Sequence, residues 1–134
     1  MSGHEIITSP ELAPPVGYAH AVRAAAGRTV WLGGQIAMDP DGAIAGATLP
    51  AQFDRAAENL LAALRAAGGD PEHLVSLQVF VTDVAAYRAA LGELGVIWRA
   101  RFGRHYPAMG LFGVTELFDP AALVELMGVA VVPA

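Results

Sequence analysis

The sequence contains no cysteine and no lysine. Without cysteine the chain can form no disulfide and no thiolate metal site, and it has no thiol nucleophile. All eight positive charges are arginines, and 13 acidic residues outweigh them to a net charge of −5. Binding to a phosphate backbone requires clustered lysine and arginine. We therefore expect no nucleic-acid partner.

Long apolar runs are also missing. No stretch approaches the roughly 20 unbroken apolar residues of a membrane-spanning helix, and the segment Met1–Glu5 lacks the basic region and apolar core of a secretory signal. We expect a cytoplasmic protein with no membrane partner. No spacing of His, Asp and Glu indicates a metal site, and no glycine-rich loop precedes a helix as in phosphate sites. The sequence therefore predicts neither metal nor cofactor.

What the chain has in excess is apolar surface. Its 134 residues are 54% hydrophobic and only 16% charged, and this length suits one domain, spanning residues 1–134. A single small domain has limited interior volume, so part of this surface is expected to be buried by self-association.

The apolar periodicity predicts an α+β fold in the order β-β-α-β-α-β-β, with two helices on one face of a sheet. An extended arm runs to Gly17. The predicted elements are strands from Tyr18 and over 29–32, a helix capped by Thr48 and ended by Gly68-Gly69, a strand over 74–82, a helix from Asp83 to Gly103, and strands over 109–117 and 123–132.

The last predicted strand, 123–132, is apolar on both faces and contains a single charge, Glu125. Strands of this kind are normally buried on both sides. The helices can cover one side, and the sheet of another subunit is the simplest cover for the other. The sequence therefore predicts a homo-oligomer.

Several short segments, taken in order, resemble the Rid family (reactive intermediate deaminase, YjgF-type). The segments are Ala13-Pro14, Gly17-Tyr18-Ala19-His20-Ala21-Val22, Val30-Trp31-Leu32-Gly33-Gly34-Gln35-Ile36, Gln52, Asn59-Leu60, Val79-Phe80-Val81-Thr82-Asp83, Tyr106-Pro107-Ala108 and Leu123-Val124-Glu125. The resemblance spans nearly the whole chain. It implies a chorismate-mutase-like fold and a homotrimer with its sheets facing inward. It also implies ligand clefts between subunits, in which enamine or imine acids are hydrolysed to keto acids and ammonia without a cofactor.

The resemblance assigns roles to particular residues. Tyr18 matches a tyrosine that lines the ligand cleft, Gly34 a glycine whose backbone N–H faces the ligand, and Glu125 a glutamate that positions or activates water. Glu125 and Tyr18 are thus the candidate catalytic residues, although Glu125 could instead be a buried carboxyl that only forms hydrogen bonds. His20 shares a strand face with Tyr18 and is either a substrate-binding proton carrier or a histidine packed at a subunit contact.

Three candidate substrate-binding positions depart from the family. Gly33 stands where serine is common, Gly95 stands near an asparagine position, and Met109 replaces the arginine of the Pro-Ala-Arg motif. Arginine binds a substrate carboxylate through two parallel hydrogen bonds, whereas methionine offers no donor. We therefore expect a flatter, larger or less charged ligand, unless Arg101 or Arg104 supplies the missing charge.

Three functions follow. The first is cofactor-free hydrolysis or tautomerisation of an enamine- or imine-type intermediate, with Glu125 as the acid/base. The second is a binding protein that holds an apolar or aromatic metabolite in the same cleft. The third, ribonuclease activity, is a label attached to parts of the family, and the acidic composition argues against it.

Overall fold

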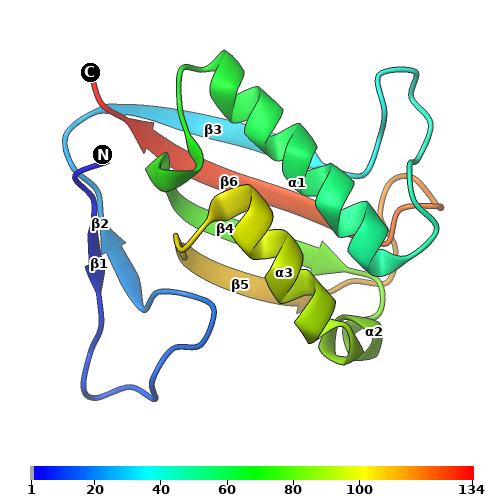
Figure 1. The fold of residues 1–134 in the computed structure, drawn as a ribbon, viewed down its shortest axis with the longest axis horizontal. Helices are drawn as coiled ribbons and strands as arrows, with labels where there is room; N and C mark the ends of the chain where they lie inside the picture. The colour runs from blue at the N-terminus through cyan, green and yellow to red at the C-terminus, as the bar shows by residue number, and fades with distance from the viewer. Residues whose placement is uncertain (1) are drawn as a thin grey trace.

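The computed structural model describes residues 2–134, which form two β-sheets and three α-helices. The larger sheet has the strand order β3-β6-β4-β5, and the smaller pairs β1 with β2 (Figure 1). The strands are β1 (Glu5–Ile7), β2 (Ala21–Arg23), β3 (Arg28–Gln35), β4 (Leu74–Val81), β5 (Ala108–Gly113) and β6 (Val124–Val132). Within the described residues no helix is long and apolar enough to cross a membrane.

The first predicted helix is confirmed as α1 (Leu49–Ala66). The Thr48 side chain accepts a hydrogen bond from the Ala51 N–H at 3.3 Å, which satisfies one of the free donors at the helix start. Beyond the helix end, Gly68 takes a φ of 84°, a left-handed conformation that favours glycine. A 3₁₀ turn, η1 (Pro71–His73), then leads into β4.

The second predicted helix is two helices, α2 (Val84–Ala89) and α3 (Leu91–Phe102). The predicted cap is confirmed, because the Asp83 side chain accepts from the Ala86 N–H at 3.0 Å. The break falls at Ala90, whose φ and ψ of −100° and 10° lie outside the helical range. Figure 1 shows α1 and α3 lying across one face of the larger sheet, with α2 at one end.

Two other boundaries differ from the sequence prediction. The predicted extended arm contains β1, which pairs antiparallel with β2, and the strand expected from Tyr18 begins only at Ala21. The strand expected over 109–117 ends at Gly113. In the strands expected from Tyr18 and over 109–117, the apolar pattern of the sequence extends beyond the ladder of backbone hydrogen bonds that defines the strand.

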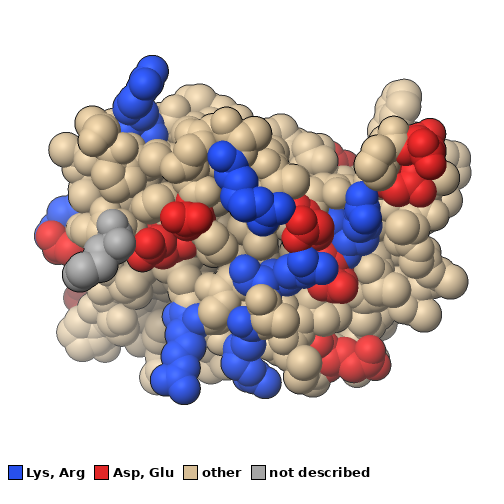
Figure 2. Space-filling view, turned by 45° about the horizontal axis from the view of Figure 1, so that its top comes forward, with Lys and Arg blue, Asp and Glu red and all other residues tan. Residues whose placement is uncertain are grey.

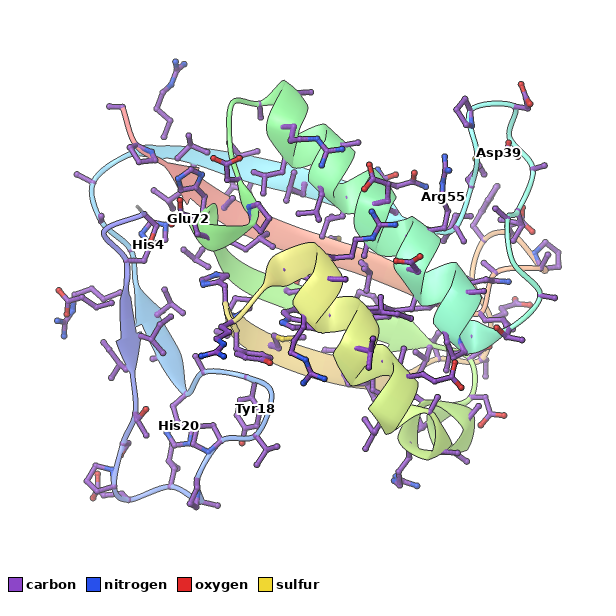
Figure 3. All side chains as sticks on the ribbon, viewed as in Figure 1. His4, Tyr18, His20, Asp39, Arg55 and Glu72 are labelled. Atoms are coloured by element: carbon purple, nitrogen blue, oxygen red, sulfur yellow. The ribbon has the colours of Figure 1, made fainter. Side chains whose placement is uncertain are left out.

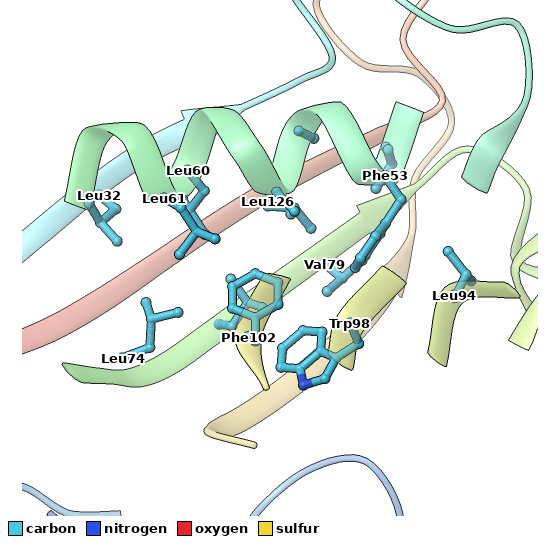
Figure 4. Close-up of a cluster of buried hydrophobic side chains, with 14 of the residues drawn as sticks. Leu32, Phe53, Leu60, Leu61, Leu74, Val79, Leu94, Trp98, Phe102 and Leu126 are labelled. Carbon is cyan, nitrogen blue, oxygen red and sulfur yellow. The ribbon is translucent and has the colours of Figure 1, made fainter. Parts of the chain in front are cut away.

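Leucines and valines on one face of the larger sheet pack against α1 and α3 to form the core (Figure 4). Leu77, Val79 and Val81 of β4 are buried there. Val75 is not, because the pairing of β4 with β6 is irregular between Leu74 and Ser76 and Leu74 takes the core position instead. Burial of each such side chain contributes about 1.5–3 kcal/mol.

The opposite face of the larger sheet is apolar and uncovered in a single chain. Trp31 of β3 is 79% exposed, and Met127 of β6 and Phe112 of β5 are also exposed. Phe80 stacks on Phe112, with ring centroids 5.7 Å apart. The last strand therefore has the two apolar faces that its sequence predicts, one of them open.

Candidate active site

Glu125 and Gly34 lie side by side near one end of the larger sheet. Glu125 is opposite Phe80 in the register of β6 with β4, so its side chain lies on the uncovered face. Its carboxyl group touches Gly34 of β3 so closely that a β-carbon there would overlap Oε1. The resemblance to the Rid family assigns both residues to the ligand site.

A cavity of about 240 Å³ surrounds this pair, lined by Gly34, Gln35, Ile36, Met38, Phe118, Asp119 and Glu125. Within residues 2–134, no side chain or backbone group hydrogen-bonds or ion-pairs with the Glu125 carboxyl group. A half-buried carboxyl with no protein partner is free to bind a ligand or a water molecule.

Gln52 of α1 fixes the segment that leads into Glu125. Its buried side chain donates from Nε2 to the carbonyl oxygens of Gly46 and Ala121 at 3.2 and 3.0 Å. Its Oε1 accepts from the Leu123 N–H at 2.8 Å. All these groups lie in loops that have few other partners, so one amide holds the start of β6 against the helix.

Asn59, two turns further along α1, fixes the segment that follows Gly34. Its Nδ2 donates to the carbonyl oxygens of Ile36 and Met38 at 2.9 and 2.7 Å. Gln52 and Asn59 are seven residues apart and therefore share one helix face. In the sequence, the two amides stand out only as part of the resemblance to the Rid family. Two amides seven residues apart on a helix, beside buried leucines, nevertheless indicate a structural role.

Tyr18 and His20 line a separate cavity of about 420 Å³, together with Leu12, Ala13, Ala19, Ala108 and Met109. Figure 3 shows both rings in the loop before β2, and their centroids are 6.1 Å apart. An isolated bridge between Ala19 and Ala108 joins this loop to β5. Tyr18 is exposed, so its hydroxyl is accessible to a ligand.

Both ring nitrogens of His20 are hydrogen-bonded to backbone. Nδ1 accepts from the Ser9 N–H at 3.0 Å, and Nε2 donates to the Ala13 carbonyl at 2.8 Å. This pattern requires the neutral ring with its proton on Nε2. His20 therefore holds the 9–13 loop in place, which favours the packing interpretation over the proton carrier.

Met109 lies on the helix-facing side of β5, because it is opposite Leu77, a core residue of β4. It also lines a third cavity, of about 380 Å³, between α2, α3 and β5. Gly95 lines the same cavity, and a β-carbon added there would meet no atom within 4 Å. Gly33 lines none of the three cavities described here.

Neither Arg101 nor Arg104 lines a cavity together with Met109. Arg101 donates to Asp54 Oδ1 at 2.8 Å and to Glu58 Oε2 at 2.5 Å. The hydrogen bond to Asp54 raises the pKa of Arg101, so it stays charged. A hydrogen bond from Arg65 lowers the pKa of Glu58 below 4.5, and Arg101 adds to the effect. Arg104 is exposed and lines none of these cavities.

Five of the predicted site residues fall into two groups. Tyr18 and His20 lie beside the edge strand β5, which contains Met109, and Gly34 and Glu125 lie at the β3–β6 side. The two groups have no cavity-lining residue in common, and Met109 and Glu125 lie on opposite faces of the sheet. Among the described residues, no three His, Asp or Glu side chains cluster as metal ligands would.

Comparison with known proteins places these features in a family context. The family model described as endoribonuclease L-PSP matches residues 8–132. Protein DfrA of Myxococcus xanthus is 33% identical over 119 residues, covering 85% of this chain and 84% of its own length. Sequence similarity therefore extends over the strands and helices that bear both groups of site residues.

Solved structures indicate the same family relationship as the sequence comparison. YyfB of Yersinia pestis, from the conserved Rid protein family, has a TM-score of 0.87 at 30% identity, covering 96% of this chain and 98% of its own. RidA from the Antarctic bacterium Psychrobacter has a TM-score of 0.68 at 27% identity, covering 96% and 99%. Rv2704 of Mycobacterium tuberculosis, of the YjgF/YER057c/UK114 family, has 0.65 at 29%, covering 97% and 100%.

Proposed function

The chain belongs to the endoribonuclease L-PSP family, with Rid proteins among its structural relatives, and on this premise we propose that it is a cofactor-free small-molecule enzyme. Its reaction is the hydrolysis (deamination) or tautomerisation of an enamine- or imine-type intermediate. The observation that supports this most is the unpartnered carboxyl of Glu125, placed against the bare backbone of Gly34 in a small cavity.

Glu125 is the acid/base in this proposal. In hydrolysis, water adds to the carbon of the C=N bond while the carboxylate takes one of its protons and delivers it to the nitrogen. The carboxylate then takes the proton of the new hydroxyl group and passes it to the nitrogen as well, so that the C–N bond breaks, ammonia leaves and the carbonyl forms. In tautomerisation, the carboxyl protonates the enamine carbon and the resulting carboxylate takes the N–H proton. Neither route needs an electron acceptor or a metal.

We place the reaction in a cleft between subunits of a homotrimer whose sheets face inward. In one chain the Tyr18 group and the Glu125 group are apart, and the face that bears Glu125 is apolar and open. A second copy packed on that face would cover Trp31 and Met127 and bring its own Tyr18 near Glu125. Tyr18 then contacts the substrate from the neighbouring subunit and orients it.

The test uses imines generated in situ as substrates. It compares the ammonia released from them by wild type, Glu125→Gln and Glu93→Gln. Glu93 is exposed on α3 and serves as the matched carboxyl control. We expect Glu125→Gln to lose at least 100-fold in kcat, in line with the usual contribution of an acid/base group, while assembly by native mass spectrometry is unchanged. Full activity of Glu125→Gln would refute the role assigned to this residue.

A non-catalytic binding protein is the alternative, and the apolar lining around Met109 favours it. It predicts saturable binding of a ligand that mass spectrometry recovers unchanged. RNA cleavage has weaker support despite the family name. The face in Figure 2 shows arginines interspersed with Asp and Glu rather than gathered into a patch. Tight RNA binding in a low-salt titration would revive it.

A further inference from the structure

The third cavity, bounded by α2, α3, β5 and the turn before Tyr18, has no charged lining residue. Its volume is about 380 Å³, and it is lined by Val16, Gly17, Phe53, Tyr87, Leu91, Leu94, Gly95, Trp98, Tyr106 and Met109. Phe53, Leu94 and Trp98 belong to the buried cluster of Figure 4 and form its inner part. Val16 and Leu91 are exposed and lie on its solvent side.

This cavity is open to solvent on one side, so a ligand that covers its apolar lining removes that surface from water. An apolar cavity of about 150 Å³ is already large enough to hold benzene, and this one is larger. Gly95 lines it without a side chain, and a β-carbon at this position would meet nothing within 4 Å. The cavity therefore has room for a substituted aromatic ring.

Two residues that line this cavity, Tyr87 and Tyr106, carry hydroxyl groups, and neither hydroxyl forms a hydrogen bond within residues 2–134. The ring of Tyr87 packs edge-on against Phe53 at a centroid distance of 6.4 Å. Burial raises the pKa of Tyr87, so the phenol stays protonated and can donate to a ligand. Its hydroxyl is not cut off from solvent, so an oxygen of the ligand would take the place of water as its partner.

The lining also discriminates by charge. A carboxylate would lose its hydration here and find no arginine or lysine. A cation would likewise find no carboxylate among the lining residues. The Trp98 ring already stacks on Phe102, at 4.1 Å, and on Tyr106, at 5.7 Å. A neutral ligand therefore suits the site best.

We propose that this cavity binds the neutral aromatic part of the ligand and that Tyr87 donates a hydrogen bond to its oxygen substituent. The assignment deepens the proposed function, on which it rests, because Met109 lines both this cavity and the one that contains Tyr18. It narrows the substrate class to aromatic compounds without a carboxylate at this end.

The experiment uses Trp98 as the reporter. A Trp31→Phe background leaves Trp98 as the sole tryptophan, since the chain has two, and native mass spectrometry checks that assembly is unchanged. The fluorescence emission of Trp98 is followed while benzyl alcohol, benzoate or benzyltrimethylammonium is added. We expect saturable binding of benzyl alcohol and at least tenfold weaker binding of both ions. Equal or tighter binding of either ion, or no saturable binding of benzyl alcohol, would overturn the proposal.

Two glycines of α3 give a matched pair of variants. Gly95→Leu projects into the cavity, whereas Gly92→Leu makes the same helix-favouring exchange at an exposed position outside it. We expect Gly95→Leu to abolish benzyl alcohol binding and Gly92→Leu to change it less than about twofold. Equal losses in both variants would contradict the assignment.

Tyr87→Phe tests the hydrogen bond. Loss of one hydrogen bond should weaken benzyl alcohol binding about fivefold and leave toluene, which has no oxygen, unchanged. An equal effect on both would show that the hydroxyl has no such role. Glu93→Gln, an exposed carboxyl exchange outside this cavity, should leave all these titrations unaltered, and ammonia release is measured separately. If benzyl alcohol does not bind, the aromatic site is refuted. The proposed acid/base chemistry is unaffected, because ammonia release tests it separately.

Discussion

The carboxyl group of Glu125 occupies the space that a β-carbon on Gly34 would need. This contact joins the only charged residue of an apolar strand to a glycine of the neighbouring strand. The contact explains why position 34 requires glycine. The reason is the lack of space for a β-carbon, not an unusual backbone conformation. The carboxyl is held at a fixed place on the uncovered sheet face, yet no protein group uses its oxygens as hydrogen-bond acceptors among the described residues.

Gly34→Ala should reduce turnover by displacing the Glu125 carboxyl, because the added methyl group meets Oε1 and Cδ. The end of a side chain can move, so the melting temperature should change little. We expect a loss of at least tenfold in kcat, measured by ammonia release. In Glu125→Gln the same glycine exchange should cost almost nothing further, as a double-mutant cycle would show. Independent, additive losses would mean that Gly34 acts in another way.

Met109→Arg should restore a preference for charged substrates. An arginine hydrogen bond to a carboxylate is worth about 1.5–3 kcal/mol, or roughly 10- to 100-fold in kcat/KM. The measurement compares an imino acid with its neutral amide. Leu111→Arg is the control, since it adds the same charge two residues further along β5 on the same face. No change in the ratio for Met109→Arg, or an equal change in both variants, would contradict the role given to Met109.

Trp31→Glu should prevent assembly, because it puts a charge on the uncovered apolar face, where Trp31 is 79% exposed. Val96→Glu is the matched control, as Val96 is an exposed apolar residue of α3 on the opposite side of the sheet. Native mass spectrometry should show monomers for Trp31→Glu and oligomers for wild type and Val96→Glu. A monomeric wild type, or an oligomeric Trp31→Glu, would remove the subunit interface from the account.

Glu58 gives a prediction on pH. Its pKa is lowered by the hydrogen bond from Arg65, so the folded state favours the carboxylate more than the unfolded state does. The resulting stability is present above the ordinary value of 4.5 and is lost as the pH falls through the lower folded value. Glu58→Gln should therefore melt slightly below wild type at neutral pH, and the difference should vanish in acid. Glu93→Gln, an exposed position, should show no such trend, and a difference that persists in acid would contradict the ion-pair explanation.

The sequence pattern was sufficient for most of the fold, because the apolar periodicities of α1, β4 and β6 are regular and their caps are strong. It missed the break at Ala90, since the apolar stripe of the second helix continues across it. It also missed β1, because three residues of ladder leave no periodicity to detect. The apolar pattern of the last strand did predict the uncovered face on which Trp31 lies.

The site was harder to predict than the fold. Tyr18, Gly34 and Glu125 were identified by resemblance, but their separation within one chain depends on sheet order, which short motifs do not encode. The anchoring roles of Gln52 and His20 depend on backbone groups 6 to 71 residues away in the sequence. The aromatic cavity arises where α3 passes over β5, and a lone Gly95 in a helix gives no sign of it.

The most direct test of the central claim mixes two inactive variants, Glu125→Gln and Tyr18→Ala, each with a different affinity tag. The account places Tyr18 of one subunit beside Glu125 of another. Mixed trimers, purified through both tags, each contain one intact site among three and should recover about a third of wild-type ammonia release. Mixed assemblies that form but stay as inactive as their parents would contradict a site shared between subunits.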